Sequence, residues 1–391
     1  MTKNTGGRRR ALLATIATAS TTIGVVAFAP LANATTANHD GGRHAVFIQT
    51  NAASGNAVVS YSRDSAGHLT KFATYPTGGK GASQDGAVVD PLASQGSLTY
   101  DARHRLLFAV NAGSDSVTVF RVDGARLQRR QVVSSDGQMP TSVSVVKDLV
   151  YVLDAANDGK ITGFSINRSD RLVHISHSTR SLGLSNPANP NFLQSPSQVA
   201  VTPDARAVIV ATKSNGVLDV FTLDRHGSPS ATPIPTQSAG AVPFALSFDK
   251  VGRLLVGEAS GGESSYRVQR DGELTTISAH VANGQAALCW SVIAKGFIYV
   301  ANAGSNTITG YSENGRGQLA LLNSSGVTAT TDAGPVDLAA TLNGRFIYQL
   351  ATGAGAIDEF KVNDDGSLTR IGAITGLTPD NGTGYEGIAA S

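Results

Sequence analysis

The sequence predicts an all-β protein, a seven-bladed β-propeller with four antiparallel strands in each blade. A strand–turn–strand pattern recurs seven times, at a spacing of about 50 residues, which is typical of propeller blades. Apolar and polar residues alternate within each copy, as they do in half-buried strands. A helical solenoid would instead need apolar residues at i, i+3 and i+4.

The clearest copy is Phe297–Tyr311, in which two strands flank a Gly-Ser turn, and Leu106–Phe120 repeats it. Five weaker copies share the pattern: Ala45–Tyr61, Leu149–Phe164, Ala207–Phe221, Leu254–Tyr266 and Phe346–Phe360. Each copy continues into a third short strand, and a loop then leads to a strand of small residues. These last strands are Pro140–Val146, Pro196–Thr202, Pro243–Phe248 and Pro335–Thr341. Small residues suit the innermost position, because the inner strands converge on the axis of the ring.

The two ends of the chain predict how the ring closes. The N-terminal part enters at the second strand of a blade, Ala45–Thr50, and the chain ends on a lone small-residue strand, Gly387–Ser391. Neither end makes a complete blade, but together they make one. We therefore expect the C-terminal strand to pair into the first blade, which leaves no open sheet edge.

Residues 1–34 have the features of a signal peptide. Arg8–Arg10 precede the apolar stretch Ala11–Ala29, and the small-x-small site Ala32-Asn33-Ala34 follows. The arginine pair also fits a twin-arginine signal. Polar residues interrupt the apolar stretch, and no other segment is long enough to span a membrane. We expect cleavage near Thr35, a short flexible segment over residues 35–42, and a secreted, extracellular propeller over residues 43–391.

Composition excludes several classes of function. Removal of residues 1–34 takes away four basic residues and no acidic ones, so the formal net charge changes from +2 to −2. No basic run remains, which argues against a nucleic-acid partner. Cys289 is the only cysteine, and His174 and His177 would point to opposite faces of a strand. We therefore expect no metal, no cofactor and no intramolecular disulfide, and we expect a monomer.

Polar residues near strand ends predict a ligand site at the mouth of the axial channel. The loops after the second strands and the loops into the inner strands should share one face, and two of the latter, Pro76–Ser94 and Gly183–Ser195, are unusually long. The expected substrate-binding residues on this face are Gln95, Asn111, Ser142, Asp154, Gln198 and Asn302. The expected catalytic acids are Glu258, Asp337 and Glu386. Alternatively, these side chains cap turns and bond neighbouring blades.

The repeats, with the motif Tyr299-Val-Ala-Asn-Ala-Gly-Ser-Asn-Thr-Ile, resemble those of lactonase-type seven-bladed propellers, the family of 6-phosphogluconolactonase and carboxymuconate lactonizing enzyme. The motif is also similar to the YVTN repeats of surface-layer propellers. The resemblance covers Arg43–Ser391. It implies an exported hydrolase that opens a small lactone or a sugar-derived ring at the channel mouth.

Three segments of this sequence correspond to segments that carry His, Arg and Glu in the family's enzymes. They are Pro140–Val143, Asp154–Lys160 and Ala211–Lys213, and here they lack these residues. The alternative function is therefore a non-catalytic binding propeller for a carbohydrate, a peptide or a cell-envelope partner.

Overall fold

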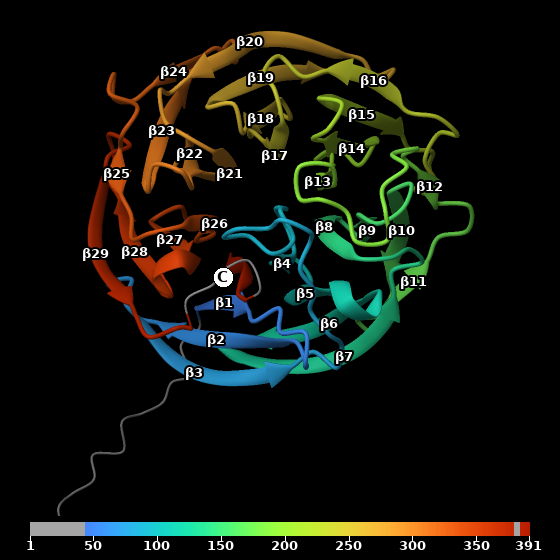
Figure 1. The fold of residues 1–391 in the computed structure, drawn as a ribbon, viewed down its shortest axis with the longest axis horizontal. Coiled ribbons are helices and arrows are strands. Elements are labelled where there is room, and N and C mark those ends of the chain that lie inside the picture. The colour runs from blue at the N-terminus through green and yellow to red at the C-terminus, as the bar shows by residue number, and fades with distance from the viewer. Residues whose placement is uncertain (1–43, 379–383) are drawn as a thin grey trace, which may run out of the picture. The chain divides into compact units, whose positions relative to one another are not determined.

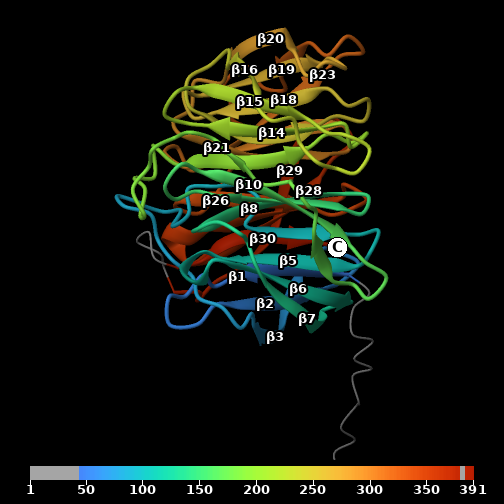
Figure 2. The ribbon, with the colours of Figure 1, turned by 90° about the vertical axis from the view of Figure 1, so that its right-hand side faces the viewer.

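Seven sheets surround a central axis (Figure 1). The computed structural model describes residues 44–378 and 384–391. Each sheet runs in antiparallel order from the axis to the rim, and two sheets carry an extra short strand. Figure 2 shows the ring from the side, with loops at its two faces. The predicted fold class, an all-β seven-bladed propeller with four antiparallel strands per blade, is confirmed.

The blades are described here from the axis outward. Blade 1 contains β30 (Glu386–Ala390), β1 (Ala45–Gln49), β2 (Ala57–Arg63) and β3 (Leu69–Pro76). Blade 2 contains β4 (Leu98–Asp101), β5 (Leu106–Asn111), β6 (Ser116–Asp123) and β7 (Arg126–Ser134). Blade 3 contains β8 (Pro140–Val146), β9 (Leu149–Asp154), β10 (Lys160–Ile166), β11 (Leu172–His174) and β12 (Arg180–Ser181). Blade 4 contains β13 (Pro196–Val201), β14 (Ala207–Thr212), β15 (Val217–Thr222) and β16 (Ile234–Gln237).

The remaining three blades follow the same order. Blade 5 contains β17 (Pro243–Phe248), β18 (Leu254–Glu258), β19 (Gly262–Val268) and β20 (Leu274–Ala282). Blade 6 contains β21 (Leu288–Ala294), β22 (Phe297–Asn302), β23 (Thr307–Glu313), β24 (Leu319–Leu321) and β25 (Ala329–Thr330). Blade 7 contains β26 (Pro335–Ala340), β27 (Phe346–Ala351), β28 (Ala356–Val362) and β29 (Leu368–Ile374).

Blade 1 is built from both ends of the described chain. Strand β30 pairs antiparallel with β1, and Val46 lies opposite Ala390. Beyond this ladder, the Ala45 backbone N donates a hydrogen bond of 2.8 Å to Ser391 Oγ, and Ser391 N donates one of 2.9 Å to Ala45 O. The C-terminal strand therefore closes the ring, as the two chain ends predict.

Tyrosines on three second strands connect their blades to the next blade. Their rings are fully buried between the blades, where a hydroxyl group needs a hydrogen-bond partner. Each hydroxyl donates to the backbone O of a turn glycine in the next blade: Tyr151 to Gly227 at 2.6 Å, Tyr299 to Gly366 at 2.8 Å, and Tyr348 to Gly67 at 2.7 Å. These contacts set the spacing of the blades at the face opposite to the mouth.

Six inner strands begin with a register shift against the second strand. Such a bulge leaves a residue unpaired and redirects its side chain. In β17 and β21 the unpaired residues are Phe244 and Cys289. In β30 the bulge contains Gly387 at φ +74°, where an added Cβ would lie 2.3 Å from Ser97 Oγ. The start of each inner strand is therefore shaped individually, although the blades repeat.

Helical structure is limited to two single turns, η1 (Ala112–Ser114) and η2 (Thr352–Ala354), in the part of the chain that the structure describes. No helix in that part is long and apolar enough to cross a membrane. The predicted signal peptide, residues 1–34, and the segment 35–42 lie outside the described residues.

Candidate functional site

Two long loops meet on one face of the ring. The first mouth loop, residues 77–97, leads into β4, and the second mouth loop, residues 182–195, leads into β13. Asp85 and Asn191 form a parallel bridge between them, and Phe192 N donates a hydrogen bond of 3.0 Å to Asp85 O. The two loops therefore contact each other on the same face of the ring. This is the arrangement that the sequence predicts, since both loops lead into inner strands.

The end of the first mouth loop, residues 90–96, contacts the inner strands of several blades and is called the plug below. The Asp90 carboxylate accepts hydrogen bonds from the backbone N of Leu92, Ala93 and Ser94, which holds the plug in a tight turn. Contacts from blades 1, 3, 4 and 6 hold the plug: Leu92 N to Glu386 Oε2 at 3.2 Å, Ser94 Oγ to Thr141 O at 2.9 Å, Gln95 N to Ser197 O at 3.1 Å, and Trp290 Nε1 to Ser94 O at 2.9 Å. Two cavities border the plug: Asp90 and Ala93 line one, and Gln95 and Gly96 line the other.

The mouth pocket is a cavity of about 310 Å³ on the outer side of the plug. Blades 4, 5 and 6 form its walls, and both mouth loops contribute to its edge. Its lining is mostly apolar, and Val88 and Leu193 at the edge are 65% and 52% exposed. Exposed apolar side chains beside an apolar cavity are typical of ligand sites. We therefore treat the mouth pocket as the candidate functional site.

An aromatic pair forms the wall on the side of blades 5 and 6. The rings of Phe244 and Trp290 meet edge to face, with centroids 5.2 Å apart. The bulge of β17 turns Phe244 toward the pocket, and the bulge of β21 does the same for Cys289. Burial raises the pKa of Cys289 to about 12, so its thiol stays protonated at neutral pH.

Lys213 is the cation of the mouth pocket. It follows β14 directly, is 3% exposed, and donates a hydrogen bond of 2.6 Å from Nζ to Ala93 O in the plug. Nζ also lies 5.2 Å from the centre of the Phe244 ring. Burial lowers the pKa of Lys213 to about 8, although the charges of Asp90 and Glu386 act in the opposite direction. A substantial fraction of this amine is therefore neutral near physiological pH.

Asp90, the first residue of the plug, forms a hydrogen-bonded acid pair with Glu386 of β30. Burial raises the pKa of both carboxyl groups, and for Glu386 the neighbouring Asp90 charge raises it further. Two adjacent buried carboxylates cannot both ionise easily, so the pair holds a proton. Asp90 lines the mouth pocket, whereas Glu386 reaches it only through Asp90. Glu386 is thus placed to position the plug.

Asp337 lies at the start of β26 and faces the inner strand of blade 1. Its carboxylate accepts hydrogen bonds from Leu338 N at 2.9 Å and Ile388 N at 3.3 Å. Burial raises the pKa of Asp337 to about 8. Asp337 lines a second cavity of about 340 Å³ among the inner strands, to which Gln95 and Gly96 of the plug also contribute. Asp337 does not line the mouth pocket.

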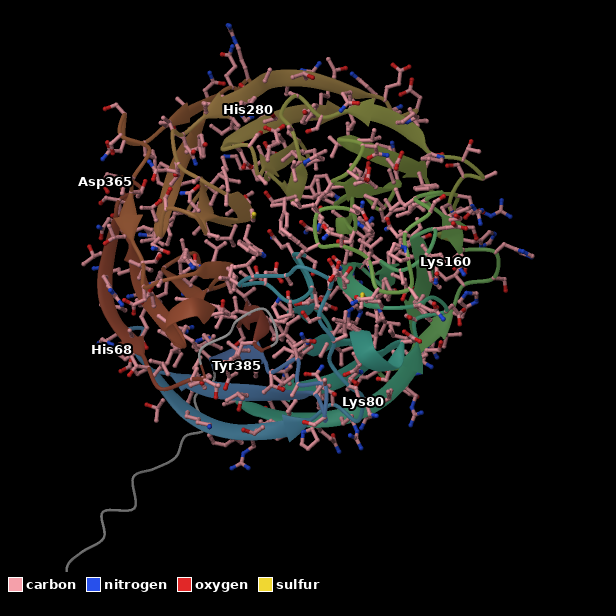
Figure 3. All side chains as sticks on the ribbon, in the orientation of Figure 1. His68, Lys80, Lys160, His280, Asp365 and Tyr385 are labelled. Carbon is pink, nitrogen blue, oxygen red and sulfur yellow. The ribbon has the colours of Figure 1, made fainter. Side chains whose placement is uncertain are left out.

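Glu258 lies at the end of β18, away from the axis. One carboxylate oxygen accepts hydrogen bonds from Ser238 Oγ at 3.0 Å, Gly240 N at 2.8 Å and Ser264 Oγ at 2.7 Å, and the other contacts His280 Nδ1 at 2.8 Å. Figure 3 shows His280 toward the rim of its blade. Glu258 is therefore fully engaged in joining blade 5 to the loop after blade 4.

Asn111 and Asn302 occupy the equivalent positions in blades 2 and 6, and both are fully buried. Asn111 Nδ2 donates to Thr118 Oγ1 at 2.9 Å, and Asn302 Nδ2 donates to Thr309 Oγ1 at 2.9 Å. Asn111 Oδ1 accepts a hydrogen bond of 3.0 Å from Asn56 of the preceding blade. Asn302 Oδ1 accepts one of 2.9 Å from Asn283, in the loop after the preceding blade. These side chains join blades rather than line the mouth pocket.

Asp154 is the blade 3 member of this set and differs from the others. Both of its carboxylate oxygens are buried without a hydrogen-bond partner among the described residues. The Ser135 hydroxyl lies beside the carboxyl group without completing a hydrogen bond. Burial raises the pKa of Asp154 to about 8, so the group is largely protonated at neutral pH. Asp154 does not line the mouth pocket.

Gln95, Ser142 and Gln198 lie close to the axis but hold backbone partners. Gln95 reaches across the axis, where Nε2 donates to Ser291 O at 2.8 Å and Oε1 accepts from Ser291 N at 2.9 Å. Ser142 Oγ donates to Gln95 O at 2.7 Å. Gln198 pairs in the same two-bond manner with the backbone of Leu246. Gln95 and Gln198 line the second cavity.

The nine predicted site residues therefore do not form one site. Asp337, Glu386, Gln95, Ser142 and Gln198 lie near the axis, whereas the other four lie further out and connect blades. No group of three or more His, Cys, Asp or Glu residues in the described ranges 44–378 and 384–391 is arranged to hold a metal ion.

Lys213, the most distinctive group of the mouth pocket, is not among the site residues predicted from the sequence. A signal for it was present in the repeats. The residue directly after the second strand is Ala112, Ala155, Ala259 and Ala303 in blades 2, 3, 5 and 6. In blade 4 the same position holds lysine. A charged residue at a position that holds alanine in these four blades marks a departure from the repeat.

Comparison with known proteins relates this chain to seven-bladed propellers of the lactonase type. Residues 20–184 match the family model described as "Lactonase, 7-bladed beta-propeller". This match confirms the resemblance to lactonase-type seven-bladed propellers that the repeats predict. A search of curated proteins finds no significant match.

Solved structures with the same fold include two described by lactonase names. A "putative 6-phosphogluconolactonase" from Bacteroides fragilis is 16% identical, with a TM-score of 0.68 over 90% of this chain and 99% of that chain. The periplasmic gluconolactonase PpgL of Pseudomonas aeruginosa is 17% identical, with a TM-score of 0.65 over 86% of this chain and 97% of that chain. At this level of identity, the likeness establishes the shared fold.

Proposed function

We propose that this protein is an exported lactonase-type propeller that binds a small lactone, or a related carbonyl compound with a mostly apolar body, in the mouth pocket. The observation that carries the proposal is the combination of an apolar cavity of about 310 Å³ with one buried lysine at its wall. The match of residues 20–184 to a lactonase model supports a ligand of this class.

The lining of the pocket supports an apolar body for the ligand. Phe244, Trp290 and Val89 offer contact area, and a lactone with an alkyl substituent would bury that substituent against them. A sugar lactone carries several hydroxyl groups that would lose water without gaining partners there. The proposal therefore favours alkyl lactones over carbohydrate-like ligands.

Lys213 would orient the ligand. Among the described residues, its Nζ has one hydrogen-bond acceptor, Ala93 O, so further N–H groups are free to bond a ligand. A lactone carbonyl is an acceptor of the right kind. Because the ammonium is desolvated, a hydrogen bond to that carbonyl would be stronger than in water.

Turnover is the second candidate function, and the match to the lactonase model favours it. Ring opening would require a base to activate water. Asp90 is the carboxylate that lines the pocket, but it already accepts three backbone hydrogen bonds. We therefore propose binding as the main function. If hydrolysis of a lactone is detected, we assign it to the same pocket.

A panel of alkyl-substituted and sugar-derived lactones tests the proposal. We expect calorimetry on residues 35–391 to detect alkyl lactones, and we expect Lys213→Gln to weaken binding about tenfold, as the loss of one charge-assisted hydrogen bond would. Lys250→Gln, an exposed turn position away from the pocket, is the matched control. Continuous pH titration of the same mixtures detects ring opening. Equal binding by the Lys213 and Lys250 variants, or no binding of any lactone, would overturn the proposal.

A further inference from the structure

We propose that Lys213 is a nucleophilic amine that forms a reversible imine with small aliphatic aldehydes and ketones that enter the mouth pocket. The inference rests on the mouth pocket being the ligand site. It adds a covalent chemistry that non-covalent lactone binding does not require.

Geometry places the amine where this chemistry needs it. Lys213 lines the pocket, and the hydrogen bond from Nζ to Ala93 O fixes the end of its side chain. Phe244 covers one side of Nζ, with its ring centre 5.2 Å away, and the neighbouring pocket wall is apolar. A carbonyl compound in the pocket would therefore lie beside an oriented amine rather than a freely rotating one.

The surroundings also favour the neutral, nucleophilic form of the amine. Lysine becomes nucleophilic when it is desolvated in an apolar pocket. Burial lowers the pKa of Lys213 to about 8, against an ordinary value of 10.5. At neutral pH, its neutral fraction is therefore on the order of 100-fold larger than that of an exposed lysine.

The groups that face Lys213 do not offer a competing nucleophile. The Cys289 thiol has its pKa raised to about 12 by burial and remains protonated. The Asp90 and Glu386 carboxyl groups share a proton, and their residual charge partly offsets the effect of burial on the pKa of the amine. Lys213 is thus the nucleophile that the described residues present to the pocket.

The step is balanced as an ordinary condensation. The ammonium first releases a proton to water, and the free electron pair of Nζ then attacks the carbonyl carbon. A proton moves from the nitrogen to the carbonyl oxygen, through water, which gives a neutral carbinolamine. The resulting carbinolamine loses its hydroxyl group with a proton as water, and the C=N bond forms. No oxidant or reductant is needed, and added water reverses the step.

Reductive trapping tests the inference on the purified protein, residues 35–391. The protein is incubated at neutral pH with butanal and cyanoborohydride, which reduces an imine to a stable secondary amine, and modified lysines are located by peptide mass mapping. We expect Lys213 to be modified at a low dose at least tenfold faster than exposed lysines such as Lys80, which Figure 3 labels, and Lys250. These lysines in the wild-type protein are internal controls that do not depend on the folding of a variant.

Two variants complete the test. Lys213→Gln, whose amide can still donate to Ala93 O, should lose the preferred adduct and keep a cooperative melt, whereas Lys250→Gln should retain the adduct. Modification of Lys213 at the same rate as, or more slowly than, the exposed lysines would overturn the inference. If lactones bind but no preferred adduct forms, the inference fails and the proposed function stands. If the adduct forms but no lactone binds, the inference stands and the proposed function fails.

Discussion

We expect individual buried acids to control how the stability of this protein depends on pH. Asp337, Asp154, Glu263 and Glu386 are all buried, and burial raises the pKa of each. In the unfolded chain these groups ionise near pH 4. The folded protein therefore holds protons that the unfolded chain releases, so the stabilisation is complete below about pH 4 and is lost as the pH rises through the folded pKa values.

Asp337→Asn should flatten the pH dependence of stability. The folded pKa of Asp337 is about 8, so the wild-type free energy of unfolding falls between about pH 4 and about pH 8 by up to about 1.4 kcal/mol per pH unit for this proton. The variant cannot ionise at this position, and its slope should be smaller by that amount. Urea unfolding across this range measures it.

The exposed position Asp158 supplies the control for this experiment. Asp158→Asn should keep the wild-type slope. The prediction is contradicted if Asp337→Asn and wild type lose stability in parallel as the pH rises. A loss of ligand binding without a change in slope would instead support the catalytic role predicted for Asp337 from the sequence.

Glu258→Gln should destabilise the protein and leave ligand binding unchanged. The carboxylate accepts hydrogen bonds from Ser238, Gly240 and Ser264 and contacts His280, and an amide can satisfy only part of this set. Loss of charge-assisted buried bonds costs about 1 to 3 kcal/mol. Chemical denaturation and lactone calorimetry measure the two effects, with the exposed Glu273→Gln as control. Loss of binding at unchanged stability would make Glu258 a site residue.

At the scale of elements, the inner strands and the plug determine where a ligand can go. The bulges at the starts of β17 and β21 direct Phe244 and Cys289 into the mouth pocket. Gln95 of the plug pairs with the backbone of Ser291 on the opposite side of the axis. A ligand in the mouth pocket would meet Lys213 and the aromatic wall, whereas Gln95 and Gln198 line the second cavity.

Deletion of residues 387–391 should destabilise the whole ring. The deletion removes most of β30, including Ile388, which is 4% exposed, and burial of such a side chain is worth about 2 to 5 kcal/mol. Each lost ladder hydrogen bond adds about 1 kcal/mol. We expect a loss of at least about 4 kcal/mol, measured by thermal and urea unfolding.

Removal of Ser391 alone is the matched control for this deletion. It leaves the β1–β30 ladder in place and takes away the hydrogen bonds of Ser391 with Ala45 and Arg63, so its effect should be much smaller. A five-residue deletion that melts at the wild-type temperature would mean that β30 does not close the ring.

For the whole molecule, the N-terminal residues predict export. Arg8–Arg10, the apolar stretch after them and Ala32-Asn33-Ala34 predict cleavage near Thr35. We expect N-terminal sequencing of the protein from the culture medium of a bacterial host to read from about this position. Replacement of Arg9 and Arg10 by lysine distinguishes twin-arginine export, which it should block, from general secretion. Recovery of an intact Met1 from the medium would contradict the cleavage.

The number of blades, the order of strands and the closure by the C-terminal strand could be predicted from the sequence alone. Strand alternation and a repeated turn are local patterns, and each copy is about 15 residues long, so they are visible without any long-range contact. The face on which the long loops lie follows from the same pattern, because antiparallel strands return each loop type to the same side.

The site could be predicted only in part. Asn111, Glu258 and Asn302 look like an equivalent polar ring in the sequence, and they are equivalent, but they lie buried between blades. Burial depends on what the loop after the preceding blade places over them. Sequence position alone does not distinguish a polar strand end that caps a neighbour from one that lines a cavity.

Tertiary structure alone decided that the plug reaches across the axis and that Lys213 lines the mouth pocket. The plug depends on contacts between residues far apart in the chain, such as Gln95 with Ser291 and Lys213 with Ala93. The sequence determined a repeating scaffold, because repeats are specified by local periodicity. The distinctive residue of the mouth pocket, Lys213, lies where one blade departs from the repeat. The loops that converge on the axis determine which such residues are buried together, and this burial shifts their pKa values.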